Sequence, residues 1–172
     1  MRTRFYKFRA ATVFITVFCL SLFVFNSCDA DEDLPSGIAN VQSTGCKNNN
    51  PRSFQPYSAN QECIEYEFVT SGVLEITHIN MSANCCPGGF IVDFEMHGDT
   101  IIVFESSTKN DCRCICLYDL NYSIKNIALD KYFFRVEQGY PEEYEKLEFE
   151  MDLNSQTEGV FCVDRNGYPW NN

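Results

Sequence analysis

The sequence is poor in basic residues and in the motifs that carry catalytic chemistry. Among its 172 residues, Lys and Arg number 13 against 24 Asp and Glu, which gives a formal net charge of −11. It contains no GxSxG, no phosphate-binding glycine loop, no HExxH and no CxxC motif. The shortage of cationic side chains excludes nucleic acid as a partner. The missing motifs predict a protein that is not an enzyme, with no catalytic residues, no cofactor and no bound metal.

Helical periodicity is also missing, and a period of two takes its place from Cys63 onward. Eight β-rich runs are separated by turn residues at the spacing typical of sandwiches and barrels. They cover residues 63–69, 73–81, 90–96, 100–106, 114–124, 131–136, 146–153 and 160–164. We therefore predict an all-β fold, an antiparallel, immunoglobulin-like β-sandwich of about eight strands.

Three local patterns support this fold. In LEFEMDL, residues 147–153, apolar side chains alternate with carboxylates, so one face of the strand must be buried. Gly98 and Asp99 join two β-rich runs and predict a tight hairpin, because glycine takes the positive φ of such turns. Tyr132 follows a short loop at a strand start and resembles the tyrosine corner of immunoglobulin-like sandwiches, although an ordinary core tyrosine fits the same pattern.

The first 27 residues have the order of a secretory signal peptide. Four basic residues in MRTRFYKFR precede the 16-residue apolar run AATVFITVFCLSLFVF, which is short for a membrane-spanning helix. Cys28 follows the small residue Ser27 and resembles the lipid-modified first residue of a bacterial lipoprotein; a disulfide partner or an ordinary cleavage boundary are the alternatives. We expect cleavage after residue 27 and membrane anchoring through fatty acids such as palmitate on Cys28.

The segment after Cys28 carries the acidic cluster DADED, residues 29–33. It resembles the export tag of lipoproteins on the outside face of the bacterial outer membrane. We therefore predict a cell-surface location, and the periplasmic face is the alternative location. The alternative role of the acidic cluster is that of a plain solvated spacer. Loss of residues 1–27 removes four of the 13 basic residues and no acidic one, so the remaining chain has a formal net charge of −15. We predict a flexible, disordered tether over residues 28–60, because this segment is rich in Asn, Ser, Pro and Gln. We predict a single disulfide-stabilised domain over residues 61–172.

Cysteine is abundant beyond Cys28. Eight cysteines, an even number in an exported chain, predict a disulfide framework. They are Cys46, Cys63, Cys85, Cys86, Cys112, Cys114, Cys116 and Cys162. In DCRCICLYDL, residues 111–120, three of them alternate on what we predict to be the buried face of one strand.

A metal site is the alternative reading of this CxCxC segment. Residues two apart on a strand stand roughly 6.5–7 Å from each other, whereas thiolates on one tetrahedral zinc lie within roughly 4 Å. Three cysteines on one flat strand therefore do not fit a tetrahedral zinc site. The same separation is at or beyond the usual Cα–Cα distance of a disulfide, so we expect the three cysteines to pair with other segments. We predict bridges from Cys46 to Cys63, from Cys85 and Cys86 to members of the 112–116 group, and from Cys162 to the remaining cysteine.

Residues 78–136 resemble a group of uncharacterised bacterial lipoproteins. The shared features are a CCP turn at residues 85–87, the CxCxCLYDL strand at residues 112–120 and KYFFRV at residues 131–136. The resemblance implies a sandwich fold and no particular activity.

The other polar side chains suit a solvated or packed role better than catalysis. His78 and His97 fit packed or solvated positions. The carboxylates alternate along three runs, as an acidic outer face of a strand would, although paired acids could also serve a hydrolase. These carboxylates are Glu65, Glu67, Asp93, Glu95, Glu148, Glu150 and Asp152.

Two aromatic residues near the end of the sequence are candidate binding residues. Tyr168 and Trp170 could stack on a sugar ring or contact a protein partner, unless they fold back over the core. We predict a membrane-anchored, surface-exposed module with a non-catalytic binding or structural role and an unknown glycan or protein partner. A metal-handling protein that uses the CxCxC strand and a glycan-binding accessory protein are the alternatives.

Overall fold

The computed structural model describes residues 37–47, 56–69, 72–139 and 144–167. The predicted signal peptide and Cys28 lie outside these ranges, as do Tyr168 and Trp170. The described residues form nine strands, which are β1 (Gly37–Ser43), β2 (Gln61–Val69), β3 (Val73–Asn84), β4 (Phe90–His97), β5 (Thr100–Ser107), β6 (Ile115–Lys125), β7 (Lys131–Glu137), β8 (Glu148–Asp152) and β9 (Glu158–Asp164). In this part of the chain no helix is long and apolar enough to cross a membrane.

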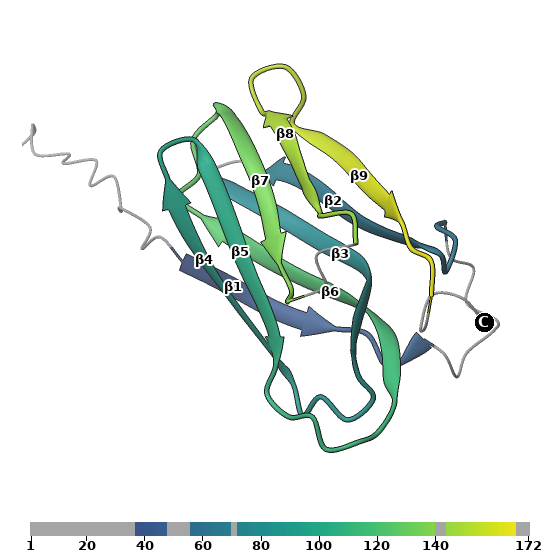
Figure 1. Ribbon diagram of the computed structural model, residues 1–172. Helices are drawn as coiled ribbons and strands as arrows, with labels where there is room; N and C mark the ends of the chain where they lie inside the picture. The colour runs from purple at the N-terminus through teal and green to yellow at the C-terminus, as the bar shows by residue number, and fades with distance from the viewer. Residues whose placement is uncertain (1–36, 48–55, 70–71, 140–143, 168–172) are drawn as a thin grey trace, which may run out of the picture. The chain divides into compact units, whose positions relative to one another are not determined.

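The strands form two sheets that pack face to face (Figure 1). One sheet has the order β1-β6-β3-β2-β9 and the other the order β4-β5-β7-β8. Alternate side chains of both sheets point inward, because successive residues of a strand face opposite sides. Leu120 and Ile124 of the first sheet and Ile101 and Phe134 of the second are completely buried. The predicted all-β sandwich is confirmed.

The smaller sheet is mixed rather than wholly antiparallel. β5 and β7 run parallel, with Thr100 opposite Phe133 and Val103 opposite Val136. Between these two strands the chain crosses to the other sheet as β6, so it returns in its original direction. The predicted antiparallel arrangement holds for the other strand pairs and is wrong for this one.

The fold begins earlier in the sequence than the predicted boundary at residue 61. Residues 37–43, assigned to the tether, form β1 and pair antiparallel with β6, with Ile38 opposite Ile124. Ile38 packs against the core, whereas the side chains from Asn40 to Ser43 are exposed. An edge strand with so little buried surface leaves only a weak alternation in the sequence, which is why it was missed.

The three local patterns have the expected structures. Leu147, Met151 and Leu153 are buried, and the carboxylates between them face outward along β8. Gly98, at φ 63°, forms the turn between β4 and β5 together with Asp99. The Tyr132 hydroxyl donates to the Ala128 carbonyl at 3.2 Å, the backbone contact expected of a tyrosine corner.

The sandwich has two distinct ends. At one end Gly37 of β1 lies opposite Lys125, the last residue of β6, and we call this the Gly37 end. At the other end lie residues 44–46 and the loops 85–89 and 108–114, and we call this the disulfide end. Figure 1 shows the two loops side by side at the bottom of the sandwich, away from the start of β1.

Candidate functional site at the disulfide end

All eight predicted cysteines form disulfides within the sandwich. The pairs are Cys46–Cys116, Cys63–Cys162, Cys85–Cys114 and Cys86–Cys112, with Cα–Cα distances of 5.4, 4.1, 5.6 and 5.5 Å. The predicted framework and the pairing of the CCP turn with the 112–116 group are confirmed. Three of the four bridges lie at the disulfide end, where they tie the CCP loop to the loop before β6 and the segment after β1 to β6 itself.

The predicted pairing of Cys46 with Cys63 is wrong. β1 pairs with β6, so the chain beyond Ser43 runs alongside the first half of β6 and brings Cys46 to Cys116. Cys63 lies directly opposite Cys162 in the register of β2 and β9. Sequence spacing did not reveal either neighbour, because both pairs depend on long-range strand order.

The predicted buried row of three cysteines is also wrong in part. β6 begins at Ile115, so only Cys116 continues the buried face formed by Tyr118, Leu120 and Tyr122. Cys112 and Cys114 lie in the preceding loop, where Cys114 is exposed and Cys112 half-buried. Their bridges join this loop to the CCP loop, and the Cys85 amide also donates to the Cys114 carbonyl at 3.1 Å.

A chain of charged side chains crosses the core between the two sheets. Arg165 Nε lies 2.6 Å from Glu62 Oε2, and Glu62 Oε1 lies 3.0 Å from His78 Nε2. His78 Nδ1 then lies 2.6 Å from Glu105 Oε2. The side chains of Glu62, His78 and Glu105 have no exposed surface. With His78 protonated, two cations and two carboxylates balance in formal charge.

The charged state of this network follows from its contacts. Burial opposes a charge on His78, but the Glu105 and Glu62 carboxylates outweigh burial and raise the His78 pKa to about 10. Burial likewise opposes a charge on Glu105, yet His78 and Gln138 hold the pKa of Glu105 below its ordinary value. Burial and the Glu105 carboxylate together raise the pKa of Tyr122. The site therefore contains an imidazolium clamped between two carboxylates.

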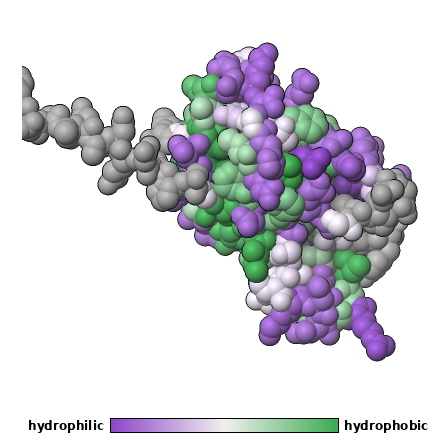
Figure 2. All heavy atoms as spheres, turned by 60° about the vertical axis from the view of Figure 1, so that its left-hand side comes forward, coloured by the Kyte–Doolittle hydropathy of each residue, from purple (hydrophilic) through white to green (hydrophobic). Residues whose placement is uncertain are grey.

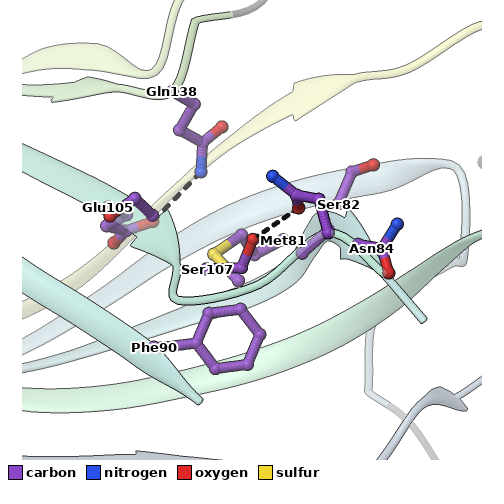
Figure 3. Close-up of a pocket in the computed structure, with 10 residues that line it drawn as sticks. Met81, Ser82, Asn84, Phe90, Glu105, Ser107 and Gln138 are labelled. Atoms are coloured by element: carbon purple, nitrogen blue, oxygen red, sulfur yellow. Dashed lines mark hydrogen bonds between the residues drawn. The ribbon is translucent and has the colours of Figure 1, made fainter. Parts of the chain in front are cut away.

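A polar hollow of about 260 Å³ opens beside this network (Figure 3). β3 supplies one wall and β4 and β5 supply the other, with Gln138 and Asn110 at the rim. Gln138 Nε2 donates to Glu105 Oε2 at 3.1 Å, and the Ser107 hydroxyl donates to Asn110 Oδ1 at 2.8 Å. The described lining residues are Met81, Ser82, Ala83, Asn84, Phe90, Glu105, Ser106, Ser107, Asn110 and Gln138.

Asn84 joins the hollow to the disulfide loops. Its Nδ2 donates to the Cys112 carbonyl at 2.6 Å, and its Oδ1 accepts from the amides of Cys86 and Cys112 at 2.9 and 3.3 Å. The wall of the hollow is therefore held by the same loops that the bridges fix.

The buried network and the hollow differ in their access to solvent. A general base must reach the proton that it abstracts, and the side chains of His78 and Glu105 are sealed from solvent. The hollow is lined by residues with amides and hydroxyls, by Phe90 and Met81, and by Glu105. Among the residues that the structure describes, no cluster of three His, Cys, Asp or Glu side chains is arranged to hold a metal ion.

A second surface feature lies on β4 and β5. Ile91, Met96 and Phe104 are 55%, 43% and 39% exposed. Figure 2 shows apolar side chains among polar ones on the face of the molecule that includes these strands. Ile91 and Phe104 lie on the outward face of these strands, whereas Met96 lies at the end of β4 in the inward phase of Val92.

The sequence placed some of these residues and missed others. His78 is packed, as predicted, and His97 is a solvated residue whose Nε2 lies 2.9 Å from Glu95 Oε2. Glu62, Glu105 and Arg165 were not singled out. The available signal was their position in the strand: Glu62 lies two residues from inward Ile64, and Glu105 two residues from inward Val103, so each carboxylate shares the buried face.

Comparison of the chain with protein-family models, with curated proteins and with solved structures finds no match. The functional assignment therefore depends on the geometry of the chain itself.

Proposed function

We propose that the protein is a lipid-anchored, extracytoplasmic binding module with no catalytic activity. The observation that carries this proposal is the polar hollow at the disulfide end, with the described fold beginning at the opposite, Gly37 end. Within the sandwich, the hollow lies at the end opposite to the one at which β1 begins. Four disulfides are typical of proteins that fold in an oxidising compartment, which agrees with export.

Palmitate labelling tests the anchor. Labelled palmitate should enter the wild-type protein and not a Cys28→Ala variant, and the variant should leave the membrane fraction. Protease added to intact cells should then degrade the wild-type protein if it lies on the cell surface, and spare it if it lies on the periplasmic face. Label that still enters the Cys28→Ala variant would contradict a lipid anchor at this residue.

A glycan ligand is the candidate that the hollow favours. Amide and hydroxyl groups can exchange hydrogen bonds with sugar hydroxyls, and the Phe90 ring offers an apolar surface for a sugar face. An array of oligosaccharides should give binding that is lost in Ser107→Trp, because the Ser107 side chain lies in the hollow beside Asn110. Thr157→Trp, on the β8–β9 turn at the other end, is the matched control and should bind normally. A flat response to every sugar would contradict the glycan proposal.

The metal-handling alternative has less support, because the eight cysteines of the sandwich form disulfides. Elemental analysis of the purified protein tests it. Stoichiometric zinc or copper would favour metal handling over the binding proposal.

A further inference from the structure

Two bridges at the disulfide end contact each other through their sulfur atoms. Cys85 Sγ belongs to the Cys85–Cys114 bridge and Cys116 Sγ to the Cys46–Cys116 bridge, and these two sulfurs lie 3.1 Å apart. Reacting atoms held about 3–3.5 Å apart are close to the separation needed for attack. A thiolate formed at Cys85 would therefore have the second bridge within reach.

The most exposed cysteine of the first bridge and the most buried cysteine of the second differ sharply in exposure. Cys114 is exposed and Cys85 half-buried, whereas Cys116 is only 3% exposed and Cys46 is half-buried. Thiol–disulfide exchange requires that the attacking thiolate reach one sulfur of the bridge. An external thiol can approach Cys114, while Cys116 is accessible to a neighbour inside the protein.

We propose that the Cys85–Cys114 bridge is a thiol-reactive site that passes reduction on to the Cys46–Cys116 bridge. A thiolate of a small dithiol reductant attacks Cys114 Sγ, the bond to Cys85 breaks, and Cys85 leaves as a thiolate with the electron pair. The Cys85 thiolate attacks Cys116 Sγ, and Cys46 leaves as a thiolate and takes up a proton.

The second thiol of the reductant completes the reaction. It attacks the reductant's own sulfur in the mixed disulfide, so that Cys114 leaves as a thiolate and takes up a proton, and the reductant becomes its own disulfide. One dithiol is oxidised and one protein bridge is reduced. The product carries a new Cys85–Cys116 bridge, with thiols at Cys46 and Cys114.

The consequence is the covalent release of β1. Cys46 follows the end of β1 and ties this edge strand to β6. After the exchange, β1 stays in place through its backbone ladder and through nearby contacts, such as Thr44 N to the Asp119 carbonyl at 2.9 Å. Faster hydrogen exchange of the β1 amides should therefore accompany the exchange of bridges.

Limited reduction of the wild-type mature protein tests the proposal. The protein is treated with low dithiothreitol and quenched in acid. Free thiols are then alkylated, and the protein is digested without reduction for mass spectrometry. The expected early product carries alkyl groups on Cys46 and Cys114 in the majority of singly reduced molecules, with a Cys85–Cys116 bridge. Alkyl groups on Cys85 and Cys114 with Cys46–Cys116 intact throughout the time course would overturn the proposal, as would simultaneous opening of all four bridges.

Two double variants provide the controls. Cys86→Ser with Cys112→Ser removes a bridge between the same loops, and alkylation of Cys46 should persist in it. Cys46→Ser with Cys116→Ser removes the acceptor bridge, so Cys85 should be alkylated instead. Loss of Cys46 alkylation in the first variant would contradict the proposed route.

Discussion

The fully buried His78 is the residue whose state most depends on its surroundings. It lies between Glu62 and Glu105, and Arg165 binds the far side of Glu62. Removing one partner of a buried ion pair leaves an uncompensated charge in a medium that solvates charges poorly. The imidazolium therefore holds two strands of one sheet and one of the other in register, since Glu62 is on β2, His78 on β3 and Glu105 on β5.

Substitution of His78 tests this role. We expect His78→Gln to lower the free energy of unfolding by about 3–5 kcal/mol, because Glu105 would remain buried without its cation. His97→Gln is the matched control, since the His97 side chain is 64% exposed and a surface substitution should change stability by less than about 0.5 kcal/mol. Urea denaturation of both variants gives the comparison. If His78→Gln were as stable as His97→Gln, the buried network would make no net contribution to the free energy of unfolding.

Protonation of His78 also predicts a pH dependence of stability. Its pKa in the folded protein is about 10, above the ordinary value of 6.5, so the folded state holds a proton that the unfolded state releases between these values. The stabilisation is complete below pH 6.5 and is lost as the pH rises towards 10. The urea midpoint of the wild type should fall from pH 6.5 to 9, and that of His78→Gln should fall less. If the urea midpoints of the wild type and of His78→Gln fell equally with pH, the result would contradict a charged His78.

At the scale of strands, a glycine of β9 leaves room for a tyrosine of β2. Gly159 lies opposite Tyr66, and a Cβ on Gly159 would lie 2.5 Å from the Tyr66 hydroxyl oxygen and 2.7 Å from its ring carbon Cζ. Tyr66 in turn stacks on Phe149 of β8, and Phe149 stacks on Phe161 of β9. The absence of a side chain at residue 159 thus leaves room for an aromatic cluster that joins both sheets.

A methyl group at this glycine should disturb the cluster. We expect Gly159→Ala to destabilise the protein by about 1–3 kcal/mol, the usual cost of overpacking. Gly45→Ala is the control, because an added Cβ there meets no atom within 4 Å. Thermal unfolding of the two variants should separate them, and an unchanged melting temperature for Gly159→Ala would show that Tyr66 moves aside freely.

Strand prediction from the sequence succeeded where alternation was strong. β8 and the Gly98 hairpin could be read directly, since their apolar and turn residues are local signals. β1 was missed because most of its side chains are exposed, and the parallel pairing of β5 with β7 depends on a crossover that no local pattern records. Glu62 and Glu105 occupy inward positions of well-predicted strands, so a search for carboxylates in the buried phase would have found them.

At the scale of the whole molecule, the bridges join segments distant in sequence. Cys63 and Cys162 are 99 residues apart and connect β2 to the edge strand β9. The number of cysteines, together with the predicted export signal, predicted that bridges exist, and the CCP turn indicated two partners. The other pairs follow from strand order, which lay beyond the reach of spacing.

Removal of the Cys63–Cys162 bridge should be costly. We expect the double variant Cys63→Ala with Cys162→Ala to lose about 2–5 kcal/mol, because the unfolded chain is freed from a long closed loop. Urea denaturation of this variant and the wild type, both without reductant, measures the difference. A loss below about 0.5 kcal/mol, the range of surface substitutions, would show that the β2–β9 ladder suffices without the bridge.

The central claim is that oxidised cysteines hold this sandwich together. Digestion of the purified, unreduced protein after alkylation, followed by mass spectrometry, tests it most directly. The account predicts no alkylated cysteine from residue 46 onward and four linked peptide pairs, joining Cys46 to Cys116, Cys63 to Cys162, Cys85 to Cys114 and Cys86 to Cys112. Eight alkylated thiols in the native protein would contradict it.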